Sequence, residues 1–211
     1  MVRHASHHPA SRAAVLPLVG GALAFDLTNT SSGRGGPKWL EHLQTAGDVI
    51  DWARHTKILT ARDAKKLHQR IDADRRLAAR LLDEMLALRE LIHSVGVNMA
   101  ATSRARARHM DELVRIHAAC LSGAHLIPSA STFVWVWNPM ETPVEAILGP
   151  IVLSALSVLT GSDLSRIKRC PGDHCGWLFF DATKNKRRRW CEMEVCGNRA
   201  KQKRRRLRGR N

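Results

Sequence analysis

Four of the five cysteines in this 211-residue chain fall within 27 residues, and their spacing limits what the C-terminal segment can fold into. Cys170 and Cys175 form one C-x4-C pair, and Cys191 and Cys196 form a second pair after 15 further residues. Two such pairs are typical of a tetrahedral zinc site, whereas disulfides require an oxidising compartment. A segment of about 40 residues buries too little apolar surface to fold alone, so we expect the metal to supply folding energy.

The residues around the two pairs predict a small finger built on that metal. Pro171 and Gly172 favour a tight knuckle. The segments 176–181 and 187–191 predict the two strands of a hairpin, joined by a turn. Helix-forming residues follow Cys196. Knuckle, hairpin and helix together form the outline of a treble-clef-like finger over residues 165–211.

Zinc in this finger is expected to be a single structural ion held by four thiolates. His174 is a rival to Cys175 for one ligand position, because imidazole also coordinates zinc well. Four protein ligands leave no open position for water, so a catalytic zinc is not expected. The sequence also lacks G-x-S-x-G, a Gly-rich phosphate loop and H-E-x-x-H, and we expect no enzymatic activity.

Positive charge is concentrated in the same segment. Between Arg166 and Asn211 there are 16 Lys and Arg against 4 Asp and Glu, a balance of +12 in a chain of formal charge +15. Such a concentration is typical of proteins that bind nucleic-acid phosphates. We expect double-stranded DNA to be bound by the cations of the hairpin turn and the terminal helix, with the start of that helix offered to base edges: Lys184, Lys186, Arg187, Arg188, Arg189, Asn198, Arg199, Lys201, Lys203 and Arg204.

Two other binding functions fit the same residues. An RNA or ribosome binder would stack unpaired bases on the finger's aromatic side chains, although these could equally form its small core: Trp177, Phe179 and Trp190. A zinc-stapled protein-interaction module with an acidic partner is the other alternative. Asn198 could also cap the terminal helix, and Arg199 could pair with an acidic neighbour, instead of contacting DNA.

Residues 15–164 predict a mostly helical α+β domain, after a flexible start at residues 1–14. Hydrophobic residues make up 44% of the chain and charged residues 25%, as in folded domains. The strongest helical periodicity runs from residue 74 to 100, where apolar residues recur every three or four positions. The other expected elements are helices at 47–56, 60–71, 110–121 and 142–161, the last interrupted or kinked by Pro150, and strands near 22–27 and 131–138.

The apolar run from Ala13 to Leu23 resembles a secretory signal. Pro17, Gly20 and Gly21 interrupt it, which favours a strand entering a turn. No other segment approaches the ~18 apolar residues that cross a bilayer. We therefore expect a cytoplasmic, nucleoid-associated protein without a membrane partner.

Two further features of this domain could serve either a function or the packing of the core. Phe133, Trp135 and Trp137 alternate along one strand and could line a ligand cavity, but packing against the long helix is favoured. Cys120 lies among apolar positions of a helix and is interpreted as a small buried hydrophobic residue without a functional role.

The segment from Arg169 to Lys201 closely resembles the CGNR zinc finger, named after the tetrapeptide at 196–199. The resemblance includes the leading Cys-Pro, the Cys-Gly-Trp followed by Phe179, Phe180 and Asp181, and the sequence RRWC before the second pair. Upstream, GGALAFDLTNT is similar to the opening of the ABATE domain, which precedes this finger in bacterial stress-induced transcription regulators. GDVIDWARHTKILTARDAKKL and LALREL are similar to its next segments.

The resemblance covers about residues 18 to 206. It implies a DNA-binding finger joined to a sensing or assembly domain, with the same four cysteines as zinc ligands. Asp26, Asn29 and Thr30 match the opening motif and could bind a small-molecule effector, but capping of a turn is the favoured role for such side chains. The N-terminal domain could also supply a homodimer interface, because short DNA-reading modules often gain specificity by dimerising.

Overall fold

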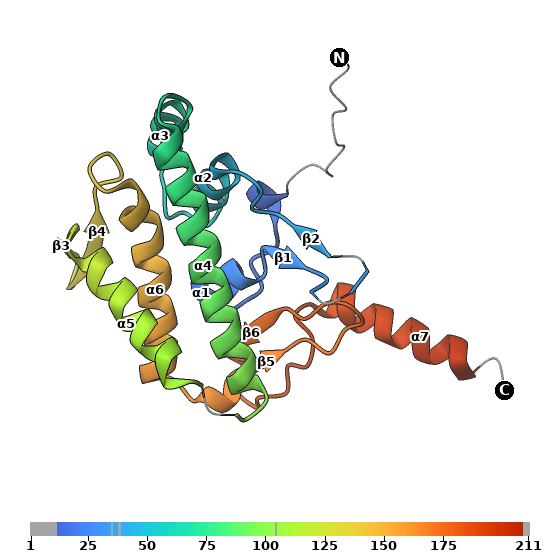
Figure 1. The fold of residues 1–211 in the computed structure, drawn as a ribbon. Helices are drawn as coiled ribbons and strands as arrows, with labels where there is room; N and C mark the ends of the chain where they lie inside the picture. Colours follow the sequence, from blue (N-terminus) through green and yellow to red (C-terminus); the bar gives the residue numbers. More distant parts are fainter. Residues whose placement is uncertain (1–11, 35, 38, 104, 209–211) are drawn as a thin grey trace, which may run out of the picture.

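The computed structural model describes residues 12–34, 36–37, 39–103 and 105–208. A bundle of helices forms the body of the molecule, the C-terminal segment packs against one end of it, and the last helix projects outward (Figure 1). The elements in chain order are η1 (Ala13–Val15), α1 (Leu23–Thr28), β1 (Ser31–Ser32), β2 (Leu40–Glu41), α2 (Ala46–His55), α3 (Ala61–Ala73), α4 (Arg75–Ala100), α5 (Ala107–Leu121), β3 (Ala124–Ser129), β4 (Thr132–Trp137), α6 (Pro143–Gly161), η2 (Leu164–Arg166), β5 (Ile167–Arg169), β6 (Leu178–Phe180), η3 (Met193–Gly197) and α7 (Asn198–Arg208).

Helix α4 is the centre of the body and confirms the helix predicted from its periodicity. Its N-terminus is capped by Asp74, whose carboxylate accepts the backbone N–H groups of Arg76 and Leu77. The apolar stripe is at most 3% exposed and consists of Leu81, Met85, Leu88, Ile92 and Val95. Helices α1, α2, α3, α5 and α6 all pack against α4, so this stripe organises the core.

Helix α6 is apolar almost all round. By length and composition it could cross a membrane, which differs from the expectation that no such segment exists. It packs against α1, α4 and α5, as a core helix does. Pro143 lies in the first turn, and Pro150 lies inside the helix without ending it.

The strand expected near residues 22–27 is helix α1. Its apolar run is too short for periodicity to distinguish a buried strand from a buried helical turn. Ala22 is extended and precedes the first helical residue, Leu23. Helix α2 is capped by Thr45, and Asp48 at the third helical position completes a capping box. Of the predicted flexible start, residues 1–11 lie outside the described residues, and Ala13 is buried in the core.

Strands β3 and β4 form an antiparallel hairpin, most of whose residues are exposed. Leu126 pairs with Trp135 and Pro128 pairs with Phe133, so these side chains share one face. Phe133 is 65% exposed and Trp135 40%, which contradicts the packing predicted for them. Trp137 does reach the body. Its Nε1–H donates to a backbone carbonyl of α5 at 2.8 Å, and its ring lies against Gly149 of α6.

Strand β6 joins the C-terminal segment to the helical body. It pairs antiparallel with β5, not with residues 187–191, so the predicted returning strand was wrong. Its alternating side chains serve two cores: Leu178 belongs to the helical core, whereas Phe179 packs among the four cysteines. Along the other side of β6, the N–H of Phe180 donates to the carbonyl of Gly20 at 2.7 Å. The finger is therefore packed into the body and not tethered by a loose linker.

A glycine on α4 provides the space for this packing. A Cβ at Gly96 would lie 2.5 Å from Cδ1 of Leu178 and 3.3 Å from the ring of Phe25. We expect Gly96→Ala to lower the free energy of unfolding by about 1 to 3 kcal/mol through overpacking, although alanine favours helices by about 1 kcal/mol. The measurement is urea unfolding followed by circular dichroism.

Gly161 at the end of α6 is the matched control for this substitution. A Cβ at Gly161 would meet no atom within 4 Å. Gly161→Ala should leave stability unchanged or raise it slightly. Equal stability of the two variants would contradict the close approach of α4 and β6.

Candidate metal centre and nucleic-acid interface

The four predicted ligands meet at one point of the finger. Their Sγ atoms all lie within 4.8 Å of one another, and Cys191 lies 3.6 Å from both Cys175 and Cys196. A tetrahedron with Zn–S bonds of about 2.3 Å has S–S edges of about 3.8 Å. The cluster thus has the size and donor set of a tetrahedral zinc site. His174 is exposed and is not part of the cluster.

Two backbone devices aim the sulfurs inward. In the first knuckle, the N–H of Cys175 donates to Gly172 at 3.0 Å, and that of Cys170 donates to Trp177 at 2.8 Å. The tight turn requires a positive φ at Gly176, where glycine is favoured. The second pair is set by the π-helical turn η3, in which the N–H of Cys196 donates to the carbonyl of Glu192.

The four sulfur atoms lie so close together that they cannot all be thiolates without a positive ion between them. Hydrogen bonding to Cys170, together with burial, raises the pKa of Cys175 to about 12. Hydrogen bonds to Cys170 and Cys175, together with burial, raise the pKa of Cys191 well above its usual range. Four thiolates can share this volume only when a cation balances their charge, which a divalent metal ion does.

Arg188 holds the metal cluster against the N-terminal segment. Its guanidinium lies 4.3 Å from the ring centroid of Phe179 and donates to the carbonyls of Val19, at 2.6 Å, and Cys191, at 2.5 Å. Phe179 is fully buried beneath it. The arginine is therefore a structural bridge, which its place in a run of three arginines did not reveal.

Residues 181–190 keep a defined path without forming a strand. Lys168 of β5 donates to the carboxylate of Asp181 at 2.6 Å and to the carbonyls of Lys186, at 2.5 Å, and Arg188, at 3.0 Å. Asp181 is buried, and it also accepts the N–H of Arg188 at 2.9 Å. These side-chain hydrogen bonds take the place of the backbone hydrogen bonds between strands that the predicted hairpin would have formed.

The cations expected to contact nucleic acid fall into two groups. Lys184, Arg187 and Arg189 are exposed on the irregular segment, whereas Lys186 pairs with the carboxylate of Asp163. The second group lies on α7, where seven of the eleven residues are Lys or Arg. Lys201, Arg204, Arg205 and Arg208 line one face of that helix.

The two groups meet at the base of α7. Arg189, Arg199, Lys203 and Arg204 border one groove of about 300 Å³ that Trp190 also lines. Lys203 additionally pairs with Asp173 at 2.7 Å. Asn198 is exposed and donates from Nδ2 to the carbonyl of Glu194 at 3.0 Å, a contact that secures the start of α7.

The three residues considered for an effector lie where the body meets the finger. Asn29 is buried and forms two hydrogen bonds with the backbone of Leu178: it accepts the N–H and donates to the carbonyl, each at 3.0 Å. Thr30 donates to Leu27 at 2.8 Å, within the turn that ends α1. Asp26 accepts the N–H of Gly20 at 2.7 Å. Burial raises the pKa of Asp26 to about 6.

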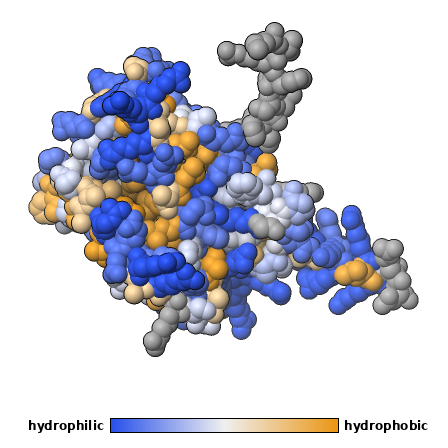
Figure 2. All heavy atoms as spheres, viewed as in Figure 1, coloured by the Kyte–Doolittle hydropathy of each residue, from blue (hydrophilic) through white to orange (hydrophobic). Residues whose placement is uncertain are grey.

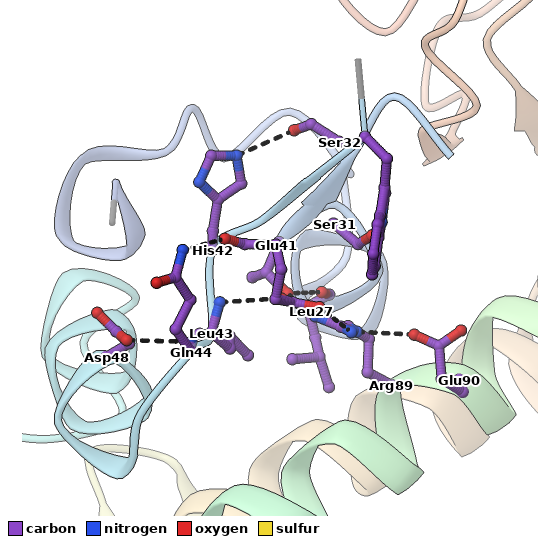
Figure 3. Close-up of polar contacts among 12 residues, drawn as sticks. Leu27, Ser31, Ser32, Glu41, His42, Leu43, Gln44, Asp48, Arg89 and Glu90 are labelled. Carbon is purple, nitrogen blue, oxygen red and sulfur yellow. Dashed lines mark hydrogen bonds and ion pairs between the residues drawn. The ribbon is translucent and has the colours of Figure 1, made fainter. Parts of the chain in front are cut away.

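The buried guanidinium of Arg89 pairs with Glu41 and Glu90 (Figure 3). Arg89 of α4 donates to both carboxylate oxygens of Glu41 at 2.6 Å, and to the hydroxyl of Thr30 at 3.3 Å. Its guanidinium also contacts Glu90 at 2.9 Å. The bidentate pair fixes β2, and β1 with it, on α4.

We expect Asn29→Ala to destabilise the protein strongly. The substitution leaves the N–H and carbonyl of Leu178 buried without partners, at about 1 to 3 kcal/mol for each. Urea unfolding measures the loss. Asn198→Ala, which removes one hydrogen bond from an exposed asparagine, should cost about 0.5 kcal/mol or less. Similar losses for both variants would contradict the role of Asn29 at this interface.

Metal binding can be tested on one ligand. Cys191→Ser should reduce the zinc content of the purified protein from one ion per chain to none, because a serine hydroxyl is a poor zinc ligand. Cys120→Ser is the matched control, since Cys120 is buried outside the cluster. Elemental analysis measures the zinc content of both variants. Full zinc content in the Cys191 variant would contradict the four-cysteine site.

Two family models match the chain. The first, ABATE, is described as "Putative stress-induced transcription regulator" and covers residues 21–162, which is more than half of the chain. The second is the CGNR zinc finger, over residues 166–209. A comparison with curated proteins gave no match. The four clustered cysteines are thus the ligands of one structural zinc ion. The chain belongs to the ABATE family and carries a CGNR zinc finger at its C-terminal end.

Proposed function

We propose that this protein regulates transcription by binding double-stranded DNA through α7 and the neighbouring irregular segment. The observation that carries the proposal is a cationic helix that stands clear of the body on a metal-locked base (Figure 1). The surface of α7 is hydrophilic apart from one hydrophobic patch near the outer end of the helix (Figure 2). No residue of α7 is buried among those the structure describes.

The dimensions of α7 suit the major groove. Eleven residues span about 16 Å, and a helix about 10 to 12 Å wide enters a groove about 12 Å wide. The face formed by Lys201, Arg204, Arg205 and Arg208 would meet phosphates, and Asn198 and Arg199 at the base of the helix would meet base edges. Arginine can pair bidentately with guanine and asparagine with adenine, which gives these two residues suitable chemistry.

The irregular segment supplies the second set of phosphate contacts. Lys184, Arg187 and Arg189 are exposed, and Lys168 and Asp181 fix the backbone that carries them, so little conformational entropy would be lost on docking. Arg188 and Lys186 are left out of this contact set, because their side chains already bond within the protein.

The helical body would report a signal to the finger. Asn29 on the turn after α1, and Gly96 on α4, both contact Leu178 of β6. Any shift of α1 or α4 therefore changes the surroundings of the strand that supports the metal cluster. This contact supports a sensing role for residues 15–164, with the finger as the output.

The dependence of DNA binding on salt tests the role of α7. Replacing Lys201, Arg204 and Arg205 by alanine should reduce the slope of log affinity against log salt by about 0.9 for each phosphate that the variant no longer neutralises. Replacing Arg62, Lys65 and Lys66 by alanine removes the same charge from the exposed side of α3 and should leave the slope unchanged. Fluorescence anisotropy with a duplex at several salt concentrations gives both slopes.

Two results would count against the proposal. Equal slopes for the α7 and α3 variants would show that α7 does not contact phosphates. Stronger competition by single-stranded RNA than by duplex DNA would identify RNA as the partner and overturn DNA binding.

A further inference from the structure

We propose that strand β4 pairs edge to edge with β4 of a second copy of this chain, so that two hairpins form one four-stranded sheet across a two-fold axis. Every residue of the β3–β4 hairpin from 125 to 135 is exposed. The large apolar side chains among them are 39% to 65% exposed and lie on both faces of the hairpin: Leu126, Phe133 and Trp135 on one face, Ile127 and Val134 on the other. A two-stranded hairpin without cover is marginally stable in water, so this one needs a partner.

The absence of charge on this hairpin favours a second copy as the partner. From residue 116 to residue 140 the sequence contains no Lys, Arg, Asp or Glu, although charged residues make up 25% of the chain. Two copies that each carry a formal charge of +15 repel one another wherever their cationic surfaces approach. The hairpin can meet its counterpart without that repulsion. Exposed edge strands of soluble proteins usually carry lysine or another charge that prevents pairing, and this hairpin carries none.

Hydrogen-bond geometry identifies β4 as the edge that can pair. Ser129 and Thr132 are partners on either side of a two-residue turn. The pair that flanks such a turn exchanges both backbone hydrogen bonds, and bonded and non-bonded pairs alternate from there. The N–H groups of Phe133 and Trp135 therefore face away from β3, and so does the nitrogen of Pro128 on the other strand. Because proline has no N–H, the outer edge of β3 lacks a donor that β4 retains. Among the described residues, no third strand pairs with either edge.

A two-fold axis at Val134 uses both of these free N–H groups. Phe133 then exchanges two backbone hydrogen bonds with the partner's Trp135, and Trp135 does the same with the partner's Phe133. The rings of each pair lie side by side on one face, and cross-strand aromatic pairs of this kind stabilise sheets. The two Val134 side chains meet on the other face. An axis at Trp135 would instead oppose Phe133 to Trp137, whose ring already packs against Gly149 of α6.

The same geometry limits the assembly to two copies and sets its strength. In the four-stranded sheet β3 lies at both outer edges, where Pro128 hinders further pairing. Standard interfaces bury about 40 Å² per residue, so the exposed residues 125 to 135 of two copies would bury roughly 900 Å² in total. This area is at the low end for specific interfaces and predicts a dissociation constant in the micromolar range.

Pairing at the hairpin would leave the nucleic-acid surface of each copy free. The hairpin and α7 lie at opposite sides of the body (Figure 1). Two fingers joined through their bodies would hold one duplex at two sites and bind it more tightly than one finger does. This use of the dimer rests on the proposed function, whereas dimerisation itself does not.

A disulfide cross-link tests the position of the axis. The Cα atoms of the two Val134 residues would lie about 4.5 Å apart, as in a non-hydrogen-bonded antiparallel pair, and a disulfide can bridge that distance. The zinc-loaded Val134→Cys chain, oxidised with diamide at micromolar concentration, should become mostly covalent dimer, with the bond between the two introduced thiols in peptide maps. Val114→Cys on α5, where the valine is 57% exposed, is the matched control and should stay mostly monomeric. Equal cross-linking of the two variants, or none in Val134→Cys, overturns the proposal.

Sedimentation equilibrium measures the association without a cross-link. The wild-type chain of 23.6 kDa should approach twice that mass as its concentration rises through the micromolar range. Val134→Lys places two ammonium groups opposite each other and should weaken the dimer at least tenfold, whereas Val114→Lys should associate as the wild type does. Zinc content and circular dichroism confirm that both variants fold. Monomers at every concentration would assign the hairpin to a different partner, and a dimer that survives Val134→Lys would lie elsewhere; either result contradicts the pairing of β4.

A duplex titration separates the dimer from the proposed function. The wild type should bind a duplex long enough for two fingers at least tenfold more tightly than Val134→Lys does. Equal affinities would overturn the role of the dimer on DNA. If neither protein binds the duplex, the proposed function fails, while sedimentation and cross-linking still decide whether β4 is the interface.

Discussion

The two hydrogen bonds between Asn29 and the backbone of Leu178 join the metal cluster to the helical core. They occur on β6, a strand of three residues whose side chains alternate between Leu178 in one core and Phe179 in the other. Among the described residues, β5 is the strand that pairs with β6, so the body must supply the remaining partners of β6. Asn29 and the carbonyl of Gly20 do so. The orientation of the finger, and with it the direction of α7, depends on these contacts.

This arrangement gives the zinc ion a wider effect than the folding of a small finger. Isolated fingers of about 40 residues gain their folding energy from the metal. Here Ile167 and Leu178, on either side of the first knuckle, also contribute to the helical core. Metal binding and packing of the body therefore stabilise the same strands. Arg188 strengthens the coupling, since one guanidinium bonds to the carbonyls of Val19 and Cys191 and covers Phe179.

The sequence predicted the metal centre and the long helix well because both depend on spacing. The paired C-x4-C motifs placed the four sulfurs, and the apolar stripe of α4 placed its buried face. Features that depend on the partner strand were missed. Nothing in the sequence from Gly176 to Asp181 indicates that this strand pairs with β5. The backbone of the predicted returning strand bonds to the side chain of Lys168 and not to β6. The aromatic alternation of β4 predicted a strand correctly, but periodicity does not show whether a strand face overhangs the body.

The tight docking of the finger restricts how a signal could reach α7. A hinge motion between body and finger would leave Leu178 N–H and its carbonyl unpaired, at about 1 to 3 kcal/mol for each, before any new contact formed. Typical coupling between two sites amounts to about 1 to 3 kcal/mol in total. A coupling of that size is too small to break both bonds of this seam and separate the finger from α1 and α4. The seam that carries Asn29 therefore favours small concerted shifts of α1, α4 and β6 over a hinge motion between body and finger.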